Sequence, residues 1–382
     1  MEGKKKMREF EIGPIRPPSE AESLLLRITR NCPWNKCKFC AIYRNAKFSV
    51  RSVEEVKEDI DQIALYRNNL VNWMSEGGHS ILRDKLYGMP DETTQRYMHV
   101  LQWLSNGEES VFLQDANTVV LTYDKLREIL SYLREKLPNI KRVTSYGRVD
   151  SLAKFTAEQL TGLKAVGLDR IHSGFETGSD KVLALINKGY TKAQEIEAGR
   201  KVKTSGIELS VYYMPGLGGR ELSDDNAVET ADVISKTNPD FVRIRTFVPH
   251  HNTELMADIQ SGVMTECTDI EKMLELKKMI ENINGADGYL YSDHIINLHE
   301  NVYGSLKTDK EKMLSVFEAF EKLDPKQQKR YQLARRMGML RSLDQMEFLG
   351  GEPLSRIDMY LEQLDDDDKF ENFLLRFLRH YI

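Results

Sequence analysis

Between residues 111 and 248 the chain repeats one pattern: a short apolar segment, a polar loop, and a longer segment with helical spacing of its apolar residues. The apolar segments do not alternate cleanly between apolar and polar residues, which is typical of strands covered on both faces. Strands separated by helices of this length form parallel sheets with the helices outside. The repeat therefore predicts an α/β fold.

Together with an earlier apolar segment, the pattern predicts six strands. They are expected at residues 24–29, 111–113, 142–144, 169–173, 207–214 and 241–248. Six parallel strands suit a partial, TIM-like (β/α)6 barrel better than a closed eight-stranded one. In such barrels the active-site residues lie at the carboxyl ends of the strands, and polar clusters follow several of the predicted strands here.

The segments around the repeats suggest a domain organisation. Residues 1–20 are polar and rich in proline, so we expect an extended lead-in. The barrel itself is expected over 21–305. Within it, a capped helix should end near Tyr66, and 69–107 should form an inserted helical pair. Residues 306–382 are charged and amphipathic, which predicts a helical C-terminal extension.

Composition narrows the classes of function. The 382 residues are 41% hydrophobic and 30% charged with a net charge of −5, which is typical of a globular protein and argues against nucleic-acid binding. We find no apolar run of about 18 residues that would predict a membrane span. The basic N-terminus lacks the apolar run of a signal peptide, so we expect a cytoplasmic protein.

Three of the four cysteines, Cys32, Cys37 and Cys40, lie within nine residues with the spacing C-x4-C-x2-C. Three soft thiolates that can converge favour an iron–sulfur cluster. A zinc site usually needs four ligands, and the remaining Cys267 is far away in the sequence. A disulfide would leave one thiol over. A [2Fe–2S] cluster of the plant type shares this spacing but would need Cys267 as its fourth ligand.

At this point the sequence resembles the radical S-adenosylmethionine (radical SAM) enzymes, which carry an aromatic residue just before the last cysteine, as Phe39 does here. Their commonest spacing, C-x3-C-x2-C, is one residue shorter. An uncharacterised subgroup, similar to Elp3-type proteins, methylthiotransferases and coproporphyrinogen dehydrogenases, shares Asn-Lys-Cys-x-Phe-Cys and the opening Arg16–Ala21. The resemblance implies a [4Fe–4S] cluster held by the three cysteines. S-adenosylmethionine would bind its open iron and be cleaved reductively to a 5′-deoxyadenosyl radical, which abstracts hydrogen from an unidentified substrate.

The resemblance also implies residues that bind S-adenosylmethionine. Glu176 takes the place of a polar residue that contacts the ribose in relatives, and Lys188 that of a basic residue near the methionine carboxylate. Gln114 ends the second strand, where the family places a glycine-rich stretch that is missing here. Tyr212 lies on the fifth strand, where relatives often place a polar residue. The cofactor-binding residues predicted in this way are Phe39, Gln114, Arg148, Glu176, Lys188 and Tyr212.

Other polar residues have two interpretations. Arg243 and Arg245 alternate with apolar neighbours, so their side chains share one face of the sixth strand. That face is either the barrel interior, where they could hold an anionic substrate, or exposed surface. His294, Asn297 and His299 are further chemical candidates, although lone histidines are more often structural.

Two other functions fit parts of the pattern. A non-catalytic, haem-binding relative of the coproporphyrinogen dehydrogenases would not need the intact cysteine triplet and the Glu176 segment. A tRNA-modifying enzyme would need an RNA-binding module, against which the negative net charge argues. The expected partners are a small-molecule or peptide substrate and an electron donor such as flavodoxin or ferredoxin, with no membrane and no nucleic acid.

Overall fold

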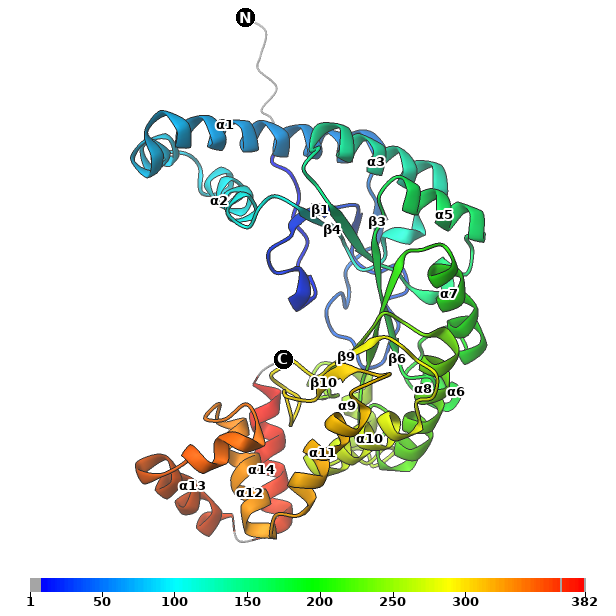
Figure 1. Cartoon of the computed structure of the whole chain (residues 1–382), viewed down its shortest axis with the longest axis vertical. Coiled ribbons are helices and arrows are strands. Elements are labelled where there is room, and N and C mark those ends of the chain that lie inside the picture. The colour runs from blue at the N-terminus through cyan, green and yellow to red at the C-terminus, as the bar shows by residue number, and fades with distance from the viewer. Residues whose placement is uncertain (1–7, 365, 381–382) are drawn as a thin grey trace, which may run out of the picture. The chain divides into compact units, whose positions relative to one another are not determined.

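The computed structural model describes residues 8–364 and 366–380, and the chain divides into two compact units (Figure 1). The first unit comprises Met1–Pro33, Asn45–His172 and Thr204–Glu208. The second comprises Trp34–Arg44, Ser173–Lys203 and Leu209–Ile382. Strand β6 (Arg170–Glu176) begins in the first unit and ends in the second. The first seven residues of the predicted lead-in lie outside the described residues.

The first unit has a parallel sheet in the order β1-β4-β5-β6. Its other strands are β1 (Leu24–Arg27), β4 (Ser110–Gln114) and β5 (Arg142–Tyr146). Successive residues of β1 and β4 are buried on both faces of the sheet, which is why these segments are continuously apolar. The short β2 (Thr29–Arg30) and β3 (Ser49–Val50) form a separate antiparallel pair.

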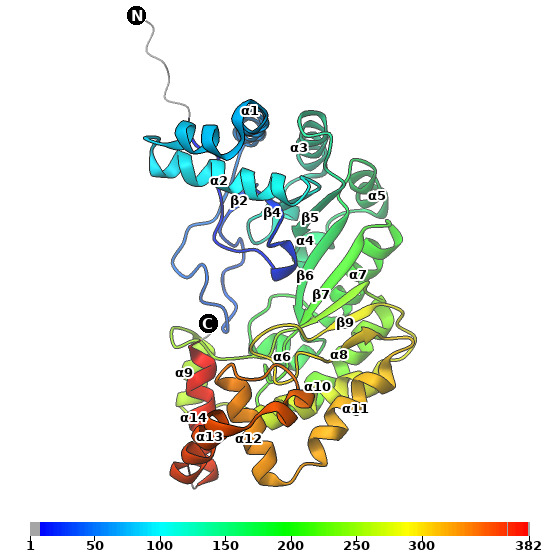
Figure 2. The same ribbon diagram turned by 60° about the vertical axis from the view of Figure 1, so that its left-hand side comes forward.

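Helices pack on this sheet, and α1 lies beside both α2 and α3 (Figures 1 and 2). The helical elements of the unit are η1 (Pro18–Glu20), α1 (Val53–Leu86), α2 (Asp91–Ser105), η2 (Thr118–Val120), α3 (Tyr123–Lys136), α4 (Val149–Leu152) and α5 (Ala157–Ala165). Within residues 8–364 and 366–380, no helix is both long and apolar enough to cross a membrane.

Helix α1 does not end near Tyr66, so that prediction is wrong. The helix begins as predicted, because the Ser52 side chain accepts a hydrogen bond from the backbone N–H of Glu55 at 3.1 Å. It continues to Gly77 and Gly78, whose backbone is non-helical, and resumes to Leu86. No glycine or proline stands between Tyr66 and Gly77, so nothing stops the helix earlier.

The second unit continues with strands β7 (Glu208–Tyr213), β8 (Phe241–Ile244), β9 (Tyr289–Tyr291) and β10 (Tyr303–Ser305), in the order β6-β7-β8-β9-β10. Strands β7, β8 and β9 are parallel, whereas β10 is antiparallel to β9. The α/β class is confirmed, and a strand lies at each of the six predicted places, although the first is divided into β1 and β2 and the last ends at Ile244. Strands β9 and β10 were not predicted, because three residues are too few to carry a pattern.

Some helices of the second unit cover the sheet, and others form the C-terminal part of the unit (Figure 2). They are α6 (Asp180–Leu185), α7 (Lys192–Thr204), η3 (Arg220–Leu222), α8 (Ser223–Thr237), α9 (Glu254–Gln260), α10 (Asp269–Asn282), α11 (Lys310–Glu321), α12 (Pro325–Arg336), η4 (Leu343–Phe348), α13 (Gly351–Gln363) and α14 (Asp367–Arg379). Arg336 of α12 forms a buried ion pair with Asp269 of α10, which ties the C-terminal helices to the rest of the unit.

Candidate functional site

The three clustered cysteines lie in one loop, which leaves β2 and returns at β3. Asn31 leads into the loop with a left-handed backbone, φ 67°. Its N–H donates to Oδ2 of Asp115 at 3.2 Å. Asp115 is fully buried directly after β4 and also accepts a hydrogen bond from Arg27 at 2.8 Å. Within the first unit, Asp115 therefore fixes the start of the loop that carries Cys32.

The later part of the loop belongs to the second unit and is anchored there. The backbone N–H of Lys38 donates to the carbonyl of Ile186 at 2.9 Å, and its carbonyl accepts from Leu255 at 3.1 Å. The N–H of Cys40 donates to the carbonyl of Cys37 at 3.2 Å. Such a turn keeps the two Cα atoms within about 7 Å, so both thiols can reach one cluster.

The donor set of the loop fits an iron–sulfur cluster. All three cysteines are half-buried, and residues 31–48 contain no histidine, aspartate or glutamate, so thiolates are the only metal ligands that the loop offers. Over residues 8–364 and 366–380, no three His, Cys, Asp or Glu side chains are grouped so that they could hold a metal ion. The assignment of the cysteines thus rests on ligand chemistry and spacing.

Cys267 is a poor candidate for a fourth ligand. It is fully buried just before α10, and burial raises the pKa of its thiol to about 12. A metal ligand must be a thiolate, which this surrounding disfavours. This argues against the [2Fe–2S] alternative.

Three of the predicted cofactor residues, Phe39, Glu176 and Lys188, lie together in the second unit. Glu176 ends β6 with a positive φ of 66°, which is uncommon for a residue with a side chain. The Lys188 ammonium donates to Oε1 of Glu176 at 3.1 Å and lies 5.4 Å from the centre of the Phe39 ring. Only 7% of the Lys188 side chain and 15% of the Glu176 side chain are exposed. We call these residues the Glu176–Lys188 cluster.

Gly174 makes room for this cluster and was not predicted from the sequence. A Cβ atom at Gly174 would lie 2.3 Å from Oε1 of Glu176 and 3.4 Å from Nζ of Lys188. The hydroxyl of Tyr190 donates to the Gly174 carbonyl at 2.7 Å. The available signal was a glycine two residues before a glutamate on one strand, which places both on the same face.

The turn that carries Lys188 is fastened to the cysteine loop. The indole N–H of Trp34 donates to the carbonyl of Asn187 at 2.8 Å. Gly189 follows with φ 84°, and a Cβ there would lie 2.3 Å from the Trp34 ring. Within the second unit, the position of Lys188 therefore depends on the loop that carries the cysteines.

Glu195 was also missed. Its carboxyl group is fully buried on α7, and neither oxygen has a hydrogen-bond partner among the described residues. Burial raises the pKa of Glu195 well above its usual value, although the positive charge of Lys188 opposes this. In the sequence Glu195 looks like any acidic residue in the first turn of a helix, so only its burial in the structure distinguishes it from the others.

Tyr212 and the two arginines share one face of the sheet. The hydroxyl of Tyr213 donates to Glu275 of α10 at 2.8 Å, so Tyr213 faces the helices and Tyr212 the opposite side. Tyr212 is opposite Arg243 in the β7–β8 register. Burial raises the pKa of Tyr212 to about 12, and the charges of Arg243 and Arg245 oppose this rise. The arginines thus lie on the sheet face turned away from the helices, where the Arg243 side chain is 12% exposed and Arg245 is exposed.

Gln114 and Arg148 lie in the first unit, where both have partners. The amide of Gln114 accepts from the N–H of Gly13 at 2.8 Å and donates to the carbonyl of Ile15 at 2.5 Å. The guanidinium of Arg148 donates to Asp150 at 2.9 Å. The Gln114 side chain therefore holds the lead-in segment against the sheet.

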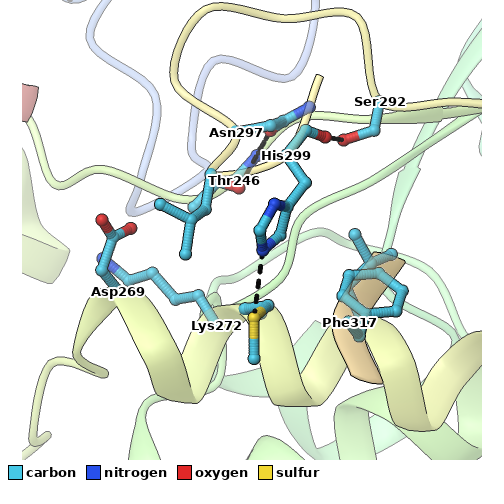
Figure 3. Close-up of a pocket in the computed structure, with 10 residues that line it drawn as sticks. Thr246, Asp269, Lys272, Ser292, Asn297, His299 and Phe317 are labelled. Carbon is cyan, nitrogen blue, oxygen red and sulfur yellow. Dashed lines mark hydrogen bonds between the residues drawn. The ribbon is translucent and has the colours of Figure 1, made fainter. Parts of the chain in front are cut away.

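Asn297 and His299 have structural surroundings (Figure 3). Asn297 accepts from the backbone N–H of Thr246 at 2.9 Å. The His299 ring stacks on Tyr331 at 5.2 Å, and its Nε2 lies 3.3 Å from the sulfur of Met273. Burial lowers the pKa of His299 to about 3. The cavity beside it, of about 10 Å³, has room for roughly one water molecule and none for a substrate.

Sequence comparison finds relatives of known function. 4′-Phospho-dehydrooxetanocin synthase of Priestia megaterium is 25% identical over 276 residues, 68% of this chain and 30% of that protein. A tRNA-2-methylthio-N(6)-dimethylallyladenosine synthase of Aquifex aeolicus (strain VF5) is 26% identical over 155 residues, 40% of this chain and 34% of that protein. The chain thus spans about a third of the length of these relatives.

Structural comparison finds similar solved structures. The methyltransferase TsrM of Kitasatospora setae, with cobalamin and a [4Fe–4S] cluster bound, is 12% identical with a TM-score of 0.44 and covers 94% of this chain and 61% of its own. Elp3 of Methanocaldococcus infernus is 16% identical with a TM-score of 0.42 and covers 61% and 65%.

The family model of the Radical SAM superfamily matches residues 26–232, more than half of the chain. The match includes the three clustered cysteines and the Glu176–Lys188 cluster. Members use a [4Fe–4S] cluster and S-adenosylmethionine as cofactors and need an electron donor. The chain therefore belongs to the radical SAM superfamily and is a radical SAM enzyme.

Proposed function

We propose that this enzyme cleaves S-adenosylmethionine reductively and takes a hydrogen atom from an organic substrate, a small molecule or a peptide. One observation supports the proposal in addition to family membership. The Lys188 ammonium donates a hydrogen bond to Glu176 and lies over the ring of Phe39, so this charged pair contacts the loop that contains Cys37 and Cys40.

The cysteines Cys32, Cys37 and Cys40 would hold the cluster and leave one iron open for the cofactor. Held in this way, the cluster and S-adenosylmethionine would together supply the radical chemistry that removes a hydrogen atom from the substrate. The protein must hold the cofactor in one orientation and exclude water.

Glu176 and Lys188 supply the two charges that the cofactor needs. In this proposal Lys188 binds the methionine carboxylate, and Glu176 accepts hydrogen bonds from the ribose hydroxyls. Without the cofactor the two side chains compensate each other at 3.1 Å, which avoids an unpaired buried charge. The cofactor would then replace one charged partner with another.

Tyr212 would be a further contact to the ribose. Because burial raises the pKa of Tyr212 to about 12, its hydroxyl keeps its proton at neutral pH and can donate a hydrogen bond. Gln114 and Arg148 are the remaining proposed contacts to the cofactor. Since the Gln114 amide holds Gly13, we expect its substitution to act mainly through the lead-in.

The reductant would be a small electron-transfer protein, flavodoxin or ferredoxin. This part of the proposal rests on family membership alone. A chemical reductant such as dithionite can replace that partner in a test, so the two questions are separable.

Anaerobic reconstitution tests the proposal. We expect about four irons per chain, an EPR signal of a reduced [4Fe–4S] cluster that changes when S-adenosylmethionine is added, and 5′-deoxyadenosine after reduction with dithionite. Cys37→Ser should lose the cluster, whereas the matched variant Cys267→Ser should keep it. A [2Fe–2S] signal that is indifferent to S-adenosylmethionine would contradict the proposal.

A further inference from the structure

The sheet of the second unit brings four polar side chains together on the face turned away from α10. Arg243 comes from β8, and Arg245 directly follows that strand, whereas Tyr212 comes from β7 and Glu176 from the end of β6. Tyr212 is opposite Arg243 in the β7–β8 register, and the N–H of Arg245 donates to the carbonyl of Tyr213 at 2.9 Å. On the other side of β7, the N–H of Met214 donates to the carbonyl of Glu176 at 2.9 Å, so the four residues lie on neighbouring strands.

The positive charges of this face are not fully balanced. Glu176 is engaged with Lys188. Asp293, just after β9, approaches Arg243 only to 3.7 Å, which is too long for a hydrogen bond, and 59% of its side chain is exposed. Nε of Arg243 is buried and has no hydrogen-bond partner among the described residues. A buried donor without an acceptor costs free energy, which an anion bound there would remove.

The surroundings of Arg243 hold its guanidinium in one orientation. Tyr291 of β9 places its ring 5.4 Å from the guanidinium carbon, and only 12% of the Arg243 side chain is exposed. Stacking on an aromatic ring fixes the plane of the guanidinium and leaves its edge for a ligand with two oxygens. The nearby His294 adds no charge at neutral pH, because burial and Arg245 lower its pKa to about 4.

We propose that Arg243 and Arg245 bind an anionic group of the substrate, a carboxylate or a phosphate. The inference rests on the proposed function, because it makes this sheet face the substrate side of the site. A guanidinium binds either anion through two parallel hydrogen bonds. Arg245 is exposed and stands about 7 Å further along the same face, where it adds a second positive charge.

The anionic group of the substrate and the carboxylate of the cofactor would have different cationic partners. Arg243 lies within β8, whereas Lys188 and the cysteines lie in loops beyond strand ends. The methionine carboxylate already has Lys188 in the proposed function. A substrate without a negative charge would leave the Arg243 donor unpaired, so the arginines would select anionic substrates.

Binding of small anions tests the inference before the substrate is known. Inorganic phosphate and succinate are the probes, with uncharged 1,4-butanediol as the reference, and binding to the reconstituted enzyme is followed by ligand-observed NMR. We expect one anion to bind and Arg243→Gln to weaken it about ten-fold or more. Arg245→Gln should weaken it several-fold. Arg356→Gln removes an exposed positive charge on α13 and should leave the affinity unchanged. The anion that binds distinguishes phosphate from carboxylate.

Three results would overturn the inference: anion affinity that is the same in both variants and the wild type, equal binding of butanediol, or an equal loss in Arg356→Gln. If circular dichroism shows that Arg243→Gln does not fold, Arg243→Lys and Arg245→Gln carry the test. Lysine keeps the positive charge but lacks the two parallel N–H donors of arginine, so Arg243→Lys should bind anions less tightly than the wild type and more tightly than Arg243→Gln.

A titration with S-adenosylmethionine, followed by EPR on the same samples, separates the two proposals. A loss of cofactor affinity in Arg243→Gln as large as the loss of anion affinity would assign the arginines to the cofactor and overturn the inference. A wild-type protein that binds the anion but never cleaves S-adenosylmethionine would instead contradict the proposed function.

Discussion

Two of the largely buried ion pairs in the second unit, Arg336–Asp269 and Lys188–Glu176, differ in geometry. Arg336 uses Nε and Nη2 to reach both oxygens of Asp269, with Nε 2.8 Å from Oδ2, and each side chain is 1% exposed. Lys188 donates to one oxygen of Glu176 at 3.1 Å, and both side chains retain some exposure. A planar fork fixes its partner in two directions, whereas an ammonium is a point charge that can turn to another acceptor. The geometry of the Arg336–Asp269 pair therefore suits a fixed contact between two helices, and that of the Lys188–Glu176 pair suits the partner exchange that we propose.

The backbone is also regular at the Arg336–Asp269 pair and irregular at the Lys188–Glu176 pair. Asp269 is the first residue of a regular helix, capped by Thr268, and Arg336 also donates to the carbonyl of Ile296 at 3.1 Å. Glu176 instead has a left-handed backbone and needs Gly174 beside it. Backbone conformations of this kind cost free energy and gather at functional sites.

Breaking the rigid pair should have the largest effect on stability. Arg336→Ala leaves the Asp269 carboxylate buried without its partner, so we expect a loss of about 3–5 kcal/mol in the free energy of unfolding. Urea denaturation measures it, with the exposed Arg356→Ala as the control. The double variant Asp269→Leu/Arg336→Leu should recover part of the loss, because it leaves no unpaired charge. Wild-type stability of Arg336→Ala would show that the two pairs do not differ as described.

Breaking the other pair should act on the cofactor. In the proposed function, Lys188→Ala would remove a charge-assisted hydrogen bond to the methionine carboxylate, worth about 1.5–3 kcal/mol, so the dissociation constant for S-adenosylmethionine should rise about ten-fold or more. Lys188→Arg, which keeps the charge, should lose less. Both are measured by EPR titration of the reconstituted enzyme. Unchanged affinity in Lys188→Ala would remove Lys188 from the cofactor site.

Gly174→Ala sharpens the comparison without removing a charge. The added Cβ would lie 2.3 Å from Oε1 of Glu176, so the carboxylate must move away from Lys188. We expect 5′-deoxyadenosine formation to fall several-fold, with a loss of stability of about 1–3 kcal/mol. Gly350→Ala is the matched control, because no atom lies within 4 Å of a Cβ at that position. Equal rates for the two variants would contradict the role of Gly174.

The smallest effect concerns acid stability near the rigid pair. The pKa of His299 is lowered from 6.5 to about 3, so between these values the unfolded chain binds a proton that the folded chain does not. His299 therefore makes stability fall with decreasing pH, by at most about 1.4 kcal/mol per pH unit. His299→Gln should show a shallower fall between pH 6.5 and 5 in urea denaturation. The exposed His79→Gln is the control, and an unchanged slope in His299→Gln would contradict the prediction.

Much of the fold follows from local sequence pattern. The six predicted strands were visible because parallel strands are buried on both faces and therefore continuously apolar. The cysteine loop was visible because its three cysteines lie within nine residues of the sequence. Strands β9 and β10 and the full length of α1 were not visible, since three-residue strands have no period and a helix continues until a residue stops it.

The site was predictable only as separate residues. By itself the sequence determined which residues could take part: the thiolates of the cysteine loop, and Glu176 and Lys188 at the ends of their segments. Tertiary structure decided that Glu176 meets Lys188 twelve residues further on, across α6. It also decided which sheet face Arg243 and Arg245 share. Alternation along a strand places two side chains on one face, but only the packing of α10 on the other face determines which face remains for a ligand.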